Sequence, residues 1–199
     1  TEAGTVLVKN ISPGSTGSAP NVLTAVGNTL FFRANDGVNG DELWKSDGTE
    51  AGTVLVKDIR PVIGSFPRYL TAVGNTLFFS ANDGVDGDEL WKSDGTEAGT
   101  VLVKNIRPGS YSGNPNDSFL NHLTVVGNTL FFSALDNVNR NELWKSDGTE
   151  AGTVLVKDIS PGSGSSTPSR LTAVGNTLFF RANDGVNGQE LWKSDGTAS

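Results

Sequence analysis

The sequence contains neither cysteine nor methionine. Without cysteine, disulfides and thiolate metal sites are excluded, so the fold must depend on packing and hydrogen bonding. The lack of free thiols fits an exported protein, although it does not exclude a cytosolic one. The chain begins inside its own repeat, and we therefore interpret it as a mature fragment.

Long apolar runs and concentrated positive charge are also missing. No apolar segment approaches the ~18 residues that span a bilayer, so we expect no membrane span. The 15 lysines and arginines are thinly spread and the net charge is −7, which leaves no basic stripe to follow a phosphate backbone. We therefore expect no nucleic-acid partner.

The amino-acid composition is that of a globular chain rich in turns. Hydrophobic residues make up 36% of the 199 residues, charged residues make up 19%, and there are 25 glycines. This composition favours many short strands joined by turns over helices.

One unit recurs four times along the chain. The segment "ELWKSDGT" places Trp44, Trp91, Trp144 and Trp192 at spacings of 47, 53 and 48 residues. The segment "VGNTLFF" keeps the same step. A repeat of about 48 residues lies in the range of propeller blades.

Each repeat carries four strand signals separated by turn signals. Gly74-Asn75 and Asp94-Gly95 are pairs that favour tight hairpin turns, because both residues tolerate positive φ. No segment has a helical period, and turn signals arrive every 8 to 12 residues, which is typical of all-β folds. The strands predicted for one repeat are Tyr69–Val73, Thr76–Ala81, Glu89–Ser93 and Thr100–Ile106.

The predicted strands are apolar on both faces. Leu77 and Phe79 point to one side of their strand, and Phe78 points to the other. Both faces of each small sheet must therefore be covered. Four-stranded meanders packed face to face around an axis satisfy this requirement, so we predict a β-propeller. A solenoid of stacked units is the alternative, but it would need polar caps that neither end shows.

The phase of the repeat predicts how the propeller closes. The chain starts with a fourth strand and ends with the first three strands of the last repeat, so Thr5–Ile11 is expected to pair with Glu190–Lys193. We slightly favour a monomeric ring of four blades over a homodimeric ring of eight. The whole chain, 1–199, is then one domain, with blades at about 22–59, 69–106, 122–159 and 170–197 plus 1–11.

At this point the repeat resembles a known family. "ELWKSDGTEAGT" (Glu42–Thr53), with "VGNTLFF" before it and "VLVKDI" behind it, is similar to the ELWxxDGT repeat proteins, which are large secreted or surface-attached bacterial proteins. The resemblance covers essentially the whole chain. It implies a propeller-like region in an extracellular or cell-surface protein, and it brings no catalytic residues.

Loop lengths point to one face of the propeller as the binding face. The loops between second and third strands, and the connections between repeats, open on the same face, which we call the variable-loop face. From the isoleucine that ends one repeat to the first leucine of the next, the steps are 12, 11, 17 and 12 residues. The longest connection contains Tyr111 and His122, which we take as candidate ligand-binding residues.

The loops between second and third strands contain clustered aspartates. "NDGVNGD" and its variants supply hard oxygen atoms, which Ca²⁺ prefers, but no helices flank them as in the helix-flanked calcium loop. The alternative, which we favour, is that Asp and Asn only set the turn geometry. The candidate metal ligands are Asp36, Asp41, Asp83, Asp86, Asp88 and Asp184.

The recurrent tryptophans and glutamates can each be interpreted as structural or as functional residues. Trp44, Trp91, Trp144 and Trp192 are expected in the core with their N–H groups bonded to carbonyls, and sugar-stacking platforms are the minority interpretation. One glutamate per repeat offers no second carboxylate for glycoside hydrolysis. No catalytic residues are predicted, and we expect no enzyme.

Two functions remain open at this stage. A non-catalytic binding module would present equivalent sites to repeated ligands such as surface glycans, or to another protein, and gain from avidity. The alternative is a structural spacer or adhesion segment without a dedicated ligand. No cofactor is expected beyond the Ca²⁺ considered above.

Overall fold

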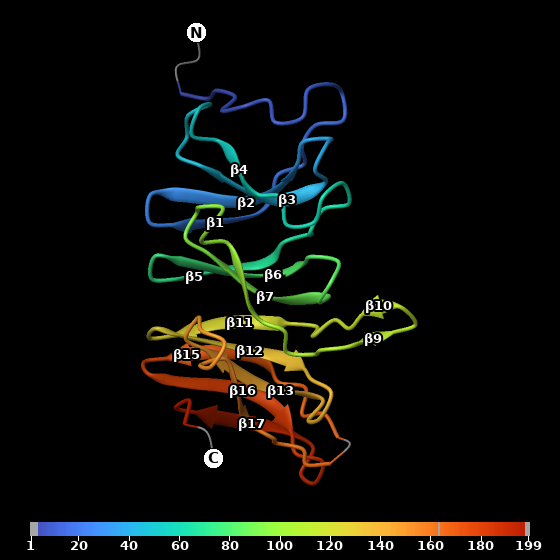
Figure 1. Ribbon diagram of the computed structural model, residues 1–199. Coiled ribbons are helices and arrows are strands. Elements are labelled where there is room, and N and C mark those ends of the chain that lie inside the picture. Colours follow the sequence, from blue (N-terminus) through green and yellow to red (C-terminus); the bar gives the residue numbers. More distant parts are fainter. Residues whose placement is uncertain (1–3, 163, 198–199) are drawn as a thin grey trace.

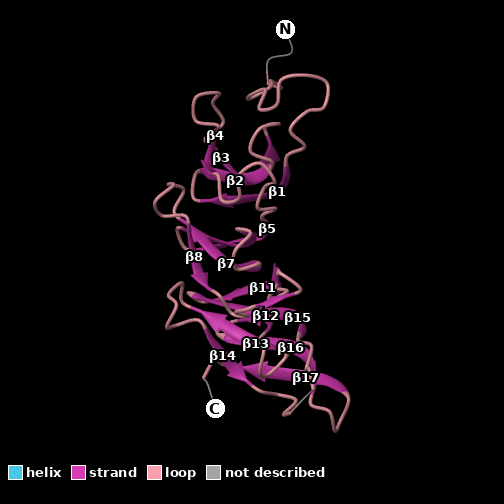
Figure 2. Ribbon diagram, turned by 45° about the vertical axis from the view of Figure 1, so that its right-hand side comes forward, coloured by secondary structure: helices cyan, strands magenta, loops and turns pink. Residues whose placement is uncertain are grey.

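The computed structural model describes residues 4–162 and 164–197. Within these ranges the ordered elements are all β-strands, joined by turns and loops (Figure 2). No helix of the described residues is long and apolar enough to cross a membrane.

The strands form successive antiparallel meanders, which we call blades 1 to 4. A short hairpin, β9 (Ser110–Tyr111) with β10 (Asn114–Pro115), extends from the connection between blades 2 and 3. Blade 1 consists of β1 (Asn21–Val26), β2 (Thr29–Asn35), β3 (Asp41–Ser46) and β4 (Val54–Lys57), and blade 2 of β5 (Arg68–Val73), β6 (Thr76–Asn82), β7 (Asp88–Ser93) and β8 (Val101–Lys104). Blade 3 consists of β11 (Asn121–Val126), β12 (Thr129–Leu135), β13 (Asn141–Ser146) and β14 (Val154–Lys157). Blade 4 consists, in the described residues, of β15 (Ser169–Val174), β16 (Thr177–Asn183) and β17 (Gln189–Ser194).

The turns form where the sequence predicts them. Gly74 has a φ of 57°, the left-handed conformation that a two-residue hairpin needs. In the "SDGT" turn, Asp94 Oδ1 accepts hydrogen bonds from Thr96 N at 2.8 Å and from Thr96 Oγ1 at 2.7 Å. Thr100 is fully buried behind this turn, with its hydroxyl 2.7 Å from Ser93 Oγ. The motif therefore builds a corner of the fold.

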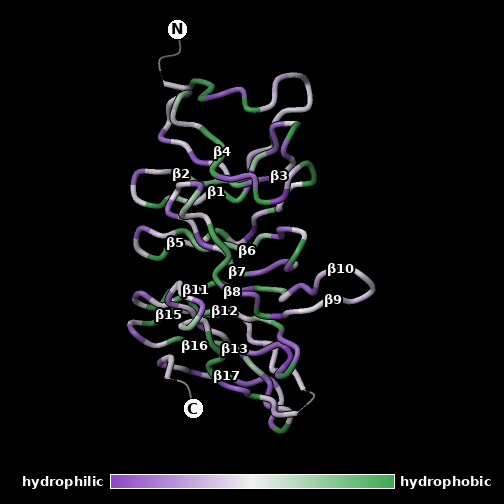
Figure 3. The backbone as a smooth tube through the Cα atoms, viewed as in Figure 1, coloured by the Kyte–Doolittle hydropathy of each residue, from purple (hydrophilic) through white to green (hydrophobic). Residues whose placement is uncertain are grey.

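The hydrophobic cores lie between blades. Leu43 of blade 1 and Leu77, Phe79 and Trp91 of blade 2 belong to one buried cluster, and equivalent clusters join blades 2 to 3 and 3 to 4. The blades are stacked one on another, with apolar segments running through the stack (Figures 1 and 3). Each sheet thus has its two apolar faces covered by its neighbours.

Lysine side chains tie each blade to the next. Lys45 Nζ donates to the carbonyl of Gly95 at 2.8 Å, and Lys92 Nζ donates to that of Gly148 at 2.8 Å. The lysine that ends β4, Lys57, donates to the carbonyl of Thr100 at 2.9 Å. Because each ammonium reaches a turn of the following blade, these bonds fix the angle between neighbouring blades.

The expected closure of the ring by the N-terminal segment is not present. In the described residues, blade 4 has three strands, and residues 5–11 form no strand and do not pair with β17. The two ends of the chain lie at opposite ends of the stack (Figure 1). Residues 1–3, which the prediction also assigned to the last blade, are outside the described residues. The physical reason is distance, because the rigid stack of interlocked blades holds blade 4 away from the start of the chain.

The inter-blade packing predicts a large effect for truncation of a central leucine. Leu90 is fully buried between blades 2 and 3, so Leu90→Ala should lower the free energy of unfolding by about 2–5 kcal/mol. Val85→Ala in the same blade is the control, because Val85 is 75% exposed and its loss should change stability by less than about 0.5 kcal/mol. Denaturant melts of both variants measure this, and equal melts would contradict the placement of the core.

Candidate binding face

The variable-loop face is organised by a bulge at the start of the first strand of each blade. Register with the second strand shifts there, for example between Arg68 and Thr71. The residue in the bulge has positive φ in every blade: 49° at Val22, and 57° at Tyr69, His122 and Arg170. Such backbone strain in non-glycine residues is uncommon and is concentrated at functional sites.

A second strained position lies three residues earlier in each repeat. Ala19, Phe66, Phe119 and Thr167 have φ values of 45° to 50°. The backbone therefore repeats at both positions, whereas the side chains differ from blade to blade. A fixed frame that displays different side chains is what a binding surface requires.

The bulges of neighbouring blades lie close together. The first strands β1, β5, β11 and β15 follow one another along the stack (Figure 1), and the hydroxyl of Thr24 donates to the carbonyl of Leu70 at 3.2 Å. The bulges of successive blades thus form a row along the stack. At the bulges and at the strained positions three residues before them, three aromatic residues are accessible: Phe66 is 36% exposed, Tyr69 is 43% exposed and Phe119 is 54% exposed.

Arginines gather at the same face. Arg33 Nε lies 3.4 Å from Asp41 Oδ1, and Arg68 NH1 lies 3.2 Å from Asp88 Oδ2. The lysines of the chain instead lie in or next to the third and fourth strands, or in the N-terminal segment. The arginines, all of which lie at or beside the variable-loop face, are Arg33, Arg60, Arg68, Arg107, Arg140, Arg170 and Arg181.

A shallow pocket opens between blades 3 and 4. Its volume is about 190 Å³. Arg181 Nε donates to Ser169 Oγ at 3.2 Å on one wall, and Ser133 Oγ donates to Asn141 Oδ1 at 2.5 Å on the other. His122 also lines the pocket. The combination offers hydrogen-bond donors and acceptors without a buried charge, which suits a polar, uncharged ligand group.

The predicted ligand-binding residues occupy different environments. Tyr111 is 81% exposed on β9, and His122 is exposed on the bulge of β11. Trp44, Trp91 and Trp144 are each 7% exposed between blades, where no ring face is open to a ligand.

Trp192 on blade 4 is half-buried. Its N–H donates to the carbonyl of Ala182 at 3.2 Å, as expected, whereas the other three indole N–H groups have no partner within the described part of the chain. The structure therefore brings His122 into the face and keeps three of the tryptophans out of it.

The bulge residues Val22, Tyr69 and Arg170 were missed by sequence reasoning. A weak signal for them exists, because a position that varies among Val, Tyr, His and Arg stands just before a leucine and a threonine that do not vary. Nothing in the residues themselves marks a left-handed backbone, since none is glycine.

The aspartates of the loops between second and third strands serve the turns. Asp36 Oδ1 accepts hydrogen bonds from Val38 N at 2.9 Å and Asn39 N at 2.8 Å, and Oδ2 accepts from Asn39 Nδ2 at 2.7 Å. The same contacts recur at Asp184, and the hydrogen bond from Asn187 N is the main cause that lowers the pKa of Asp184.

The candidate metal ligands do not converge. Asp41 and Asp88 face arginines, and Asp86 Oδ1 accepts from Asn105 Nδ2 at 2.6 Å. Asp83 Oδ1 accepts from two backbone N–H groups of its own turn, at 2.8 Å each. The described residues contain no group of three or more His, Cys, Asp or Glu side chains that could hold a metal ion.

This arrangement predicts that Ca²⁺ does not stabilise the fold. An ion that binds the folded chain would raise the melting temperature by mass action. Because the loop carboxylates are already satisfied by N–H donors, thermal melts in Ca²⁺ and in chelator should coincide. A higher melting temperature in Ca²⁺, abolished by Asp83→Asn, would show that the turn interpretation is wrong.

The recurrent glutamates fasten the connection that follows each blade. Glu42 is fully buried, and its Oε1 accepts hydrogen bonds from Arg60 N at 2.9 Å and Ser65 N at 3.0 Å. Glu89 accepts from Ile106 N at 2.9 Å and Arg107 N at 3.2 Å. Each glutamate therefore satisfies backbone N–H groups that would otherwise be buried without a partner.

Burial shifts the ionisation of these glutamates. It raises the pKa of Glu42 from 4.5 to about 7 and that of Glu89 from 4.5 to about 8, against the opposing effect of the hydrogen bonds that each carboxylate accepts. Burial also raises the pKa of Glu142. The equivalent Glu190 on blade 4 is exposed. A raised pKa often marks a general acid, but the carboxyl groups of Glu42, Glu89 and Glu142 are enclosed by the connection whose backbone N–H groups they bind.

The raised pKa predicts a pH dependence of stability. The folded chain binds the Glu89 proton more tightly than the unfolded chain does, so this group stabilises the fold below pH 4.5 and loses its contribution as pH rises towards 8. Glu89→Gln should flatten that decline, because the amide keeps an acceptor for the backbone and carries no charge. Urea melts between pH 5 and 9 measure the slope, and an unchanged slope in Glu89→Gln would contradict a neutral Glu89.

Comparisons with known proteins bear on the fold. No protein-family model matches the chain, and no curated protein matches it. Among solved structures, a crystal structure of the puromycin hydrolase S511A mutant complexed with PGG is similar over 92% of this chain, with a TM-score of 0.56 and 16% identity. The chain has the β-propeller fold.

A second similar structure, of a prolyl endopeptidase, matches 84% of the chain at a TM-score of 0.49 and 15% identity. The chain spans 28% and 25% of the lengths of these two structures. At 16% identity, the likeness to the puromycin hydrolase structure concerns the propeller architecture alone.

Proposed function

We propose that this propeller is a non-catalytic binding module of an exported bacterial protein of the ELWxxDGT repeat type, and that its ligand lies on the variable-loop face. The observation that carries the proposal is the strained bulge. Every blade keeps the same left-handed backbone there, yet the displayed residues are Val22, Tyr69, His122 and Arg170.

The chemistry of this face favours a glycan. Exposed rings at Phe66, Tyr69, Phe119 and Tyr111 offer flat apolar surfaces with little rotamer entropy to lose. Arginine–aspartate pairs beside them, such as Arg68 with Asp88, offer donors and acceptors for hydroxyl groups. Similar but unequal sites on successive blades would gain affinity for a repeating polymer through avidity.

The same face argues against catalysis. Hydrolysis of a glycosidic bond needs two carboxyl groups on a cleft, with one pKa raised. The carboxyl groups with the most raised pKa values, Glu42 and Glu89, are fully buried and bonded to backbone N–H groups. Asp88, whose pKa burial raises, is paired with Arg68, and the neighbouring carboxyl group of Asp117 accepts a hydrogen bond from the Asp88 backbone N–H at 2.8 Å.

The alternative function is a spacer or adhesion segment without a dedicated ligand. One observation favours it: the blades form an open stack whose length grows with each repeat (Figure 1). A spacer, however, gives no reason for accessible aromatic residues at strained backbone positions. We therefore rank the binding module first.

A glycan array probed with the 199-residue chain tests the proposal. If a glycan binds, Tyr69→Ala should weaken it by about 1–2 kcal/mol, roughly tenfold, without a change in melting temperature. Tyrosine and alanine both carry a Cβ atom, so the strain of the left-handed backbone at position 69 is the same before and after the change. The matched control is Glu97→Ala, an exposed change on the opposite face of the same blade, which should leave affinity unaltered. Silence on the array from folded protein would favour the spacer.

A further inference from the structure

The N-terminal segment occupies the place of a fourth strand belonging to a blade before blade 1. Its sequence from Thr5 to Lys9, "TVLVK", is identical to that from Thr53 to Lys57. Lys9 Nζ donates to the carbonyl of Thr53 at 2.8 Å, as Lys57 donates to that of Thr100. Ile11 packs against Phe32, Ala34 and Trp44, the position that Ile59 and its equivalents take in other blades.

The outer side of this segment is uncovered. Val6 is 79% exposed and Leu7 is 80% exposed. Leu102, which holds the position of Leu7 in the fourth strand of blade 2, packs against the core between blades 1 and 2. Leu30 of blade 1 is 36% exposed, while Leu77 at the same position in blade 2 is fully buried. This end of the stack, which we call the head, thus presents half of an inter-blade core.

The opposite end presents the other half. In blade 4, β17 has no fourth strand beside it in the described residues. Leu191 is 76% exposed, although Leu43 and Leu90 at the same position are fully buried. We call this end the tail.

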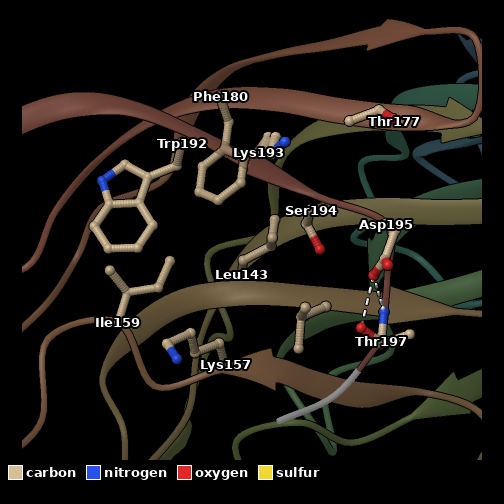
Figure 4. Close-up of a pocket in the computed structure, with 11 residues that line it drawn as sticks. Leu143, Lys157, Ile159, Thr177, Phe180, Trp192, Lys193, Ser194, Asp195 and Thr197 are labelled. Atoms are coloured by element: carbon tan, nitrogen blue, oxygen red, sulfur yellow. Dashed lines mark hydrogen bonds between the residues drawn. The ribbon is translucent and has the colours of Figure 1, made fainter.

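A cavity of about 450 Å³ opens beside β17, with Ile159, Phe180 and Trp192 on its walls (Figure 4). Figure 4 shows Trp192 and Phe180 of blade 4 facing Ile159 and Leu143 of blade 3. In blades 2 and 3 the fourth strand supplies a leucine to the equivalent core: Leu102 in one and Leu155 in the other.

The two ends are complementary in residue type. Inside the stack, each core takes a phenylalanine, a leucine, a valine and an isoleucine from one blade, and Leu, Phe, Ala and Trp from the next. The head already has Ile11 of the first set and Phe32, Ala34 and Trp44 of the second. The residues it lacks are a phenylalanine and a leucine. The tail carries their equivalents, with Phe179 half-buried and Leu191 exposed.

We propose that the tail of one copy of this chain binds the head of a second copy, with β17 pairing to residues 5–11. The register of β3 with β4 joins Leu43 to Lys57, Trp44 to Leu55 and Lys45 to Val54. Applied to the new pair, it joins Leu191 to Lys9, Trp192 to Leu7 and Lys193 to Val6. Leu7 then fills the cavity beside Trp192.

Two further contacts of the internal joints recur in this pairing. In the stack, a phenylalanine packs against the glycine of the next "SDGT" turn, as Phe31 does against Gly95, and a lysine donates to that glycine's carbonyl. At the head, the equivalent Gly48 has nothing within 4 Å of the place where a Cβ would stand. It is therefore free to receive Phe179 and Lys193 of the second copy.

The partner is a second copy and not the chain's own start. Residues 5–11 are seated on blade 1 at the opposite end of the stack from β17 (Figure 1). Head and tail are different surfaces, so the contact is head-to-tail. Two copies joined at both ends close a ring of eight blades, and copies that do not close continue as a filament.

Cross-linking tests this pairing, because the chain has no cysteine of its own. The change Val6→Cys in one preparation and Lys193→Cys in another places one thiol in each copy, at residues that the register sets opposite each other. Directly opposed strand residues lie about 4.5–5.5 Å apart between Cα atoms, within the reach of a disulfide. After mild oxidation of the mixture, we expect a disulfide-linked species of two chains on a non-reducing gel.

The matched control replaces Lys193→Cys with Val186→Cys. Val186 is 87% exposed on a loop of the same blade, away from the proposed contact, and should give at most a trace of the linked species. A chain that carries both Val6→Cys and Lys193→Cys separates the two modes of closure. Linkage within that single chain, with none between the two single variants, would overturn the proposal.

Light scattering supplies an independent measurement on the unmodified chain. At micromolar concentration we expect a mass of at least twice 20.8 kDa. Leu191→Asp should return it to the mass of one chain without unfolding it, because Leu191 is exposed in the single chain, while Val186→Asp should not. A mass of 20.8 kDa for the unmodified chain across the concentration range would contradict the second copy, whatever the glycan array shows.

Discussion

Every blade of this propeller is apolar on both faces, and the rest of the structure depends on that constraint. A single sheet with Phe78 on one side and Leu77 and Phe79 on the other would expose apolar side chains to water on both faces. Each blade therefore needs a neighbour on both sides, and the core of the molecule is divided among the joints between blades. Stability is then a sum of neighbour terms and not the property of one central core.

The polar residues that never vary serve this packing. The lysines of third and fourth strands bond to carbonyls of the next blade, and the buried glutamates satisfy N–H groups of the connection that leads there. From the sequence alone, these recurrent lysines and glutamates could be taken for functional residues. Here they complete hydrogen bonds that the close approach of two sheets would otherwise leave unmade.

Local structure could be predicted from the sequence more fully than the arrangement of the ends. The strand expected at Thr76–Ala81 is β6, Thr76–Asn82, because alternation and turn pairs act over a few residues. The strand expected at Thr100–Ile106 is shorter, Val101–Lys104, since Glu89 draws the backbone of Ile106 and Arg107 out of the ladder. The hairpin of β9 and β10 was not predicted, because its two-residue strands carry no alternation.

The candidate site was only partly predictable. Loop length pointed to the variable-loop face, where His122 lies. The left-handed bulge at His122 depends on the pairing of two strands and has no glycine in the sequence to mark it. The tryptophans could be placed in the core from their repetition. The "ELWKSDGT" segment around Trp44 and Trp192 is the same, so it could not predict that the N–H of Trp192 is bonded while that of Trp44 is unpaired. Matching ends could be recognised in the sequence, but the distance between them is a property of the stack.

The lysine contacts between blades have a consequence for how such chains change over generations. Each ammonium reaches one blade ahead and no farther, and the surfaces that meet at every joint are nearly the same. A recombination event that duplicates or removes one whole repeat therefore joins two surfaces that already fit. Whole blades can thus be gained or lost without any new kind of joint, while point substitutions in the bulges and connections change the displayed side chains one blade at a time.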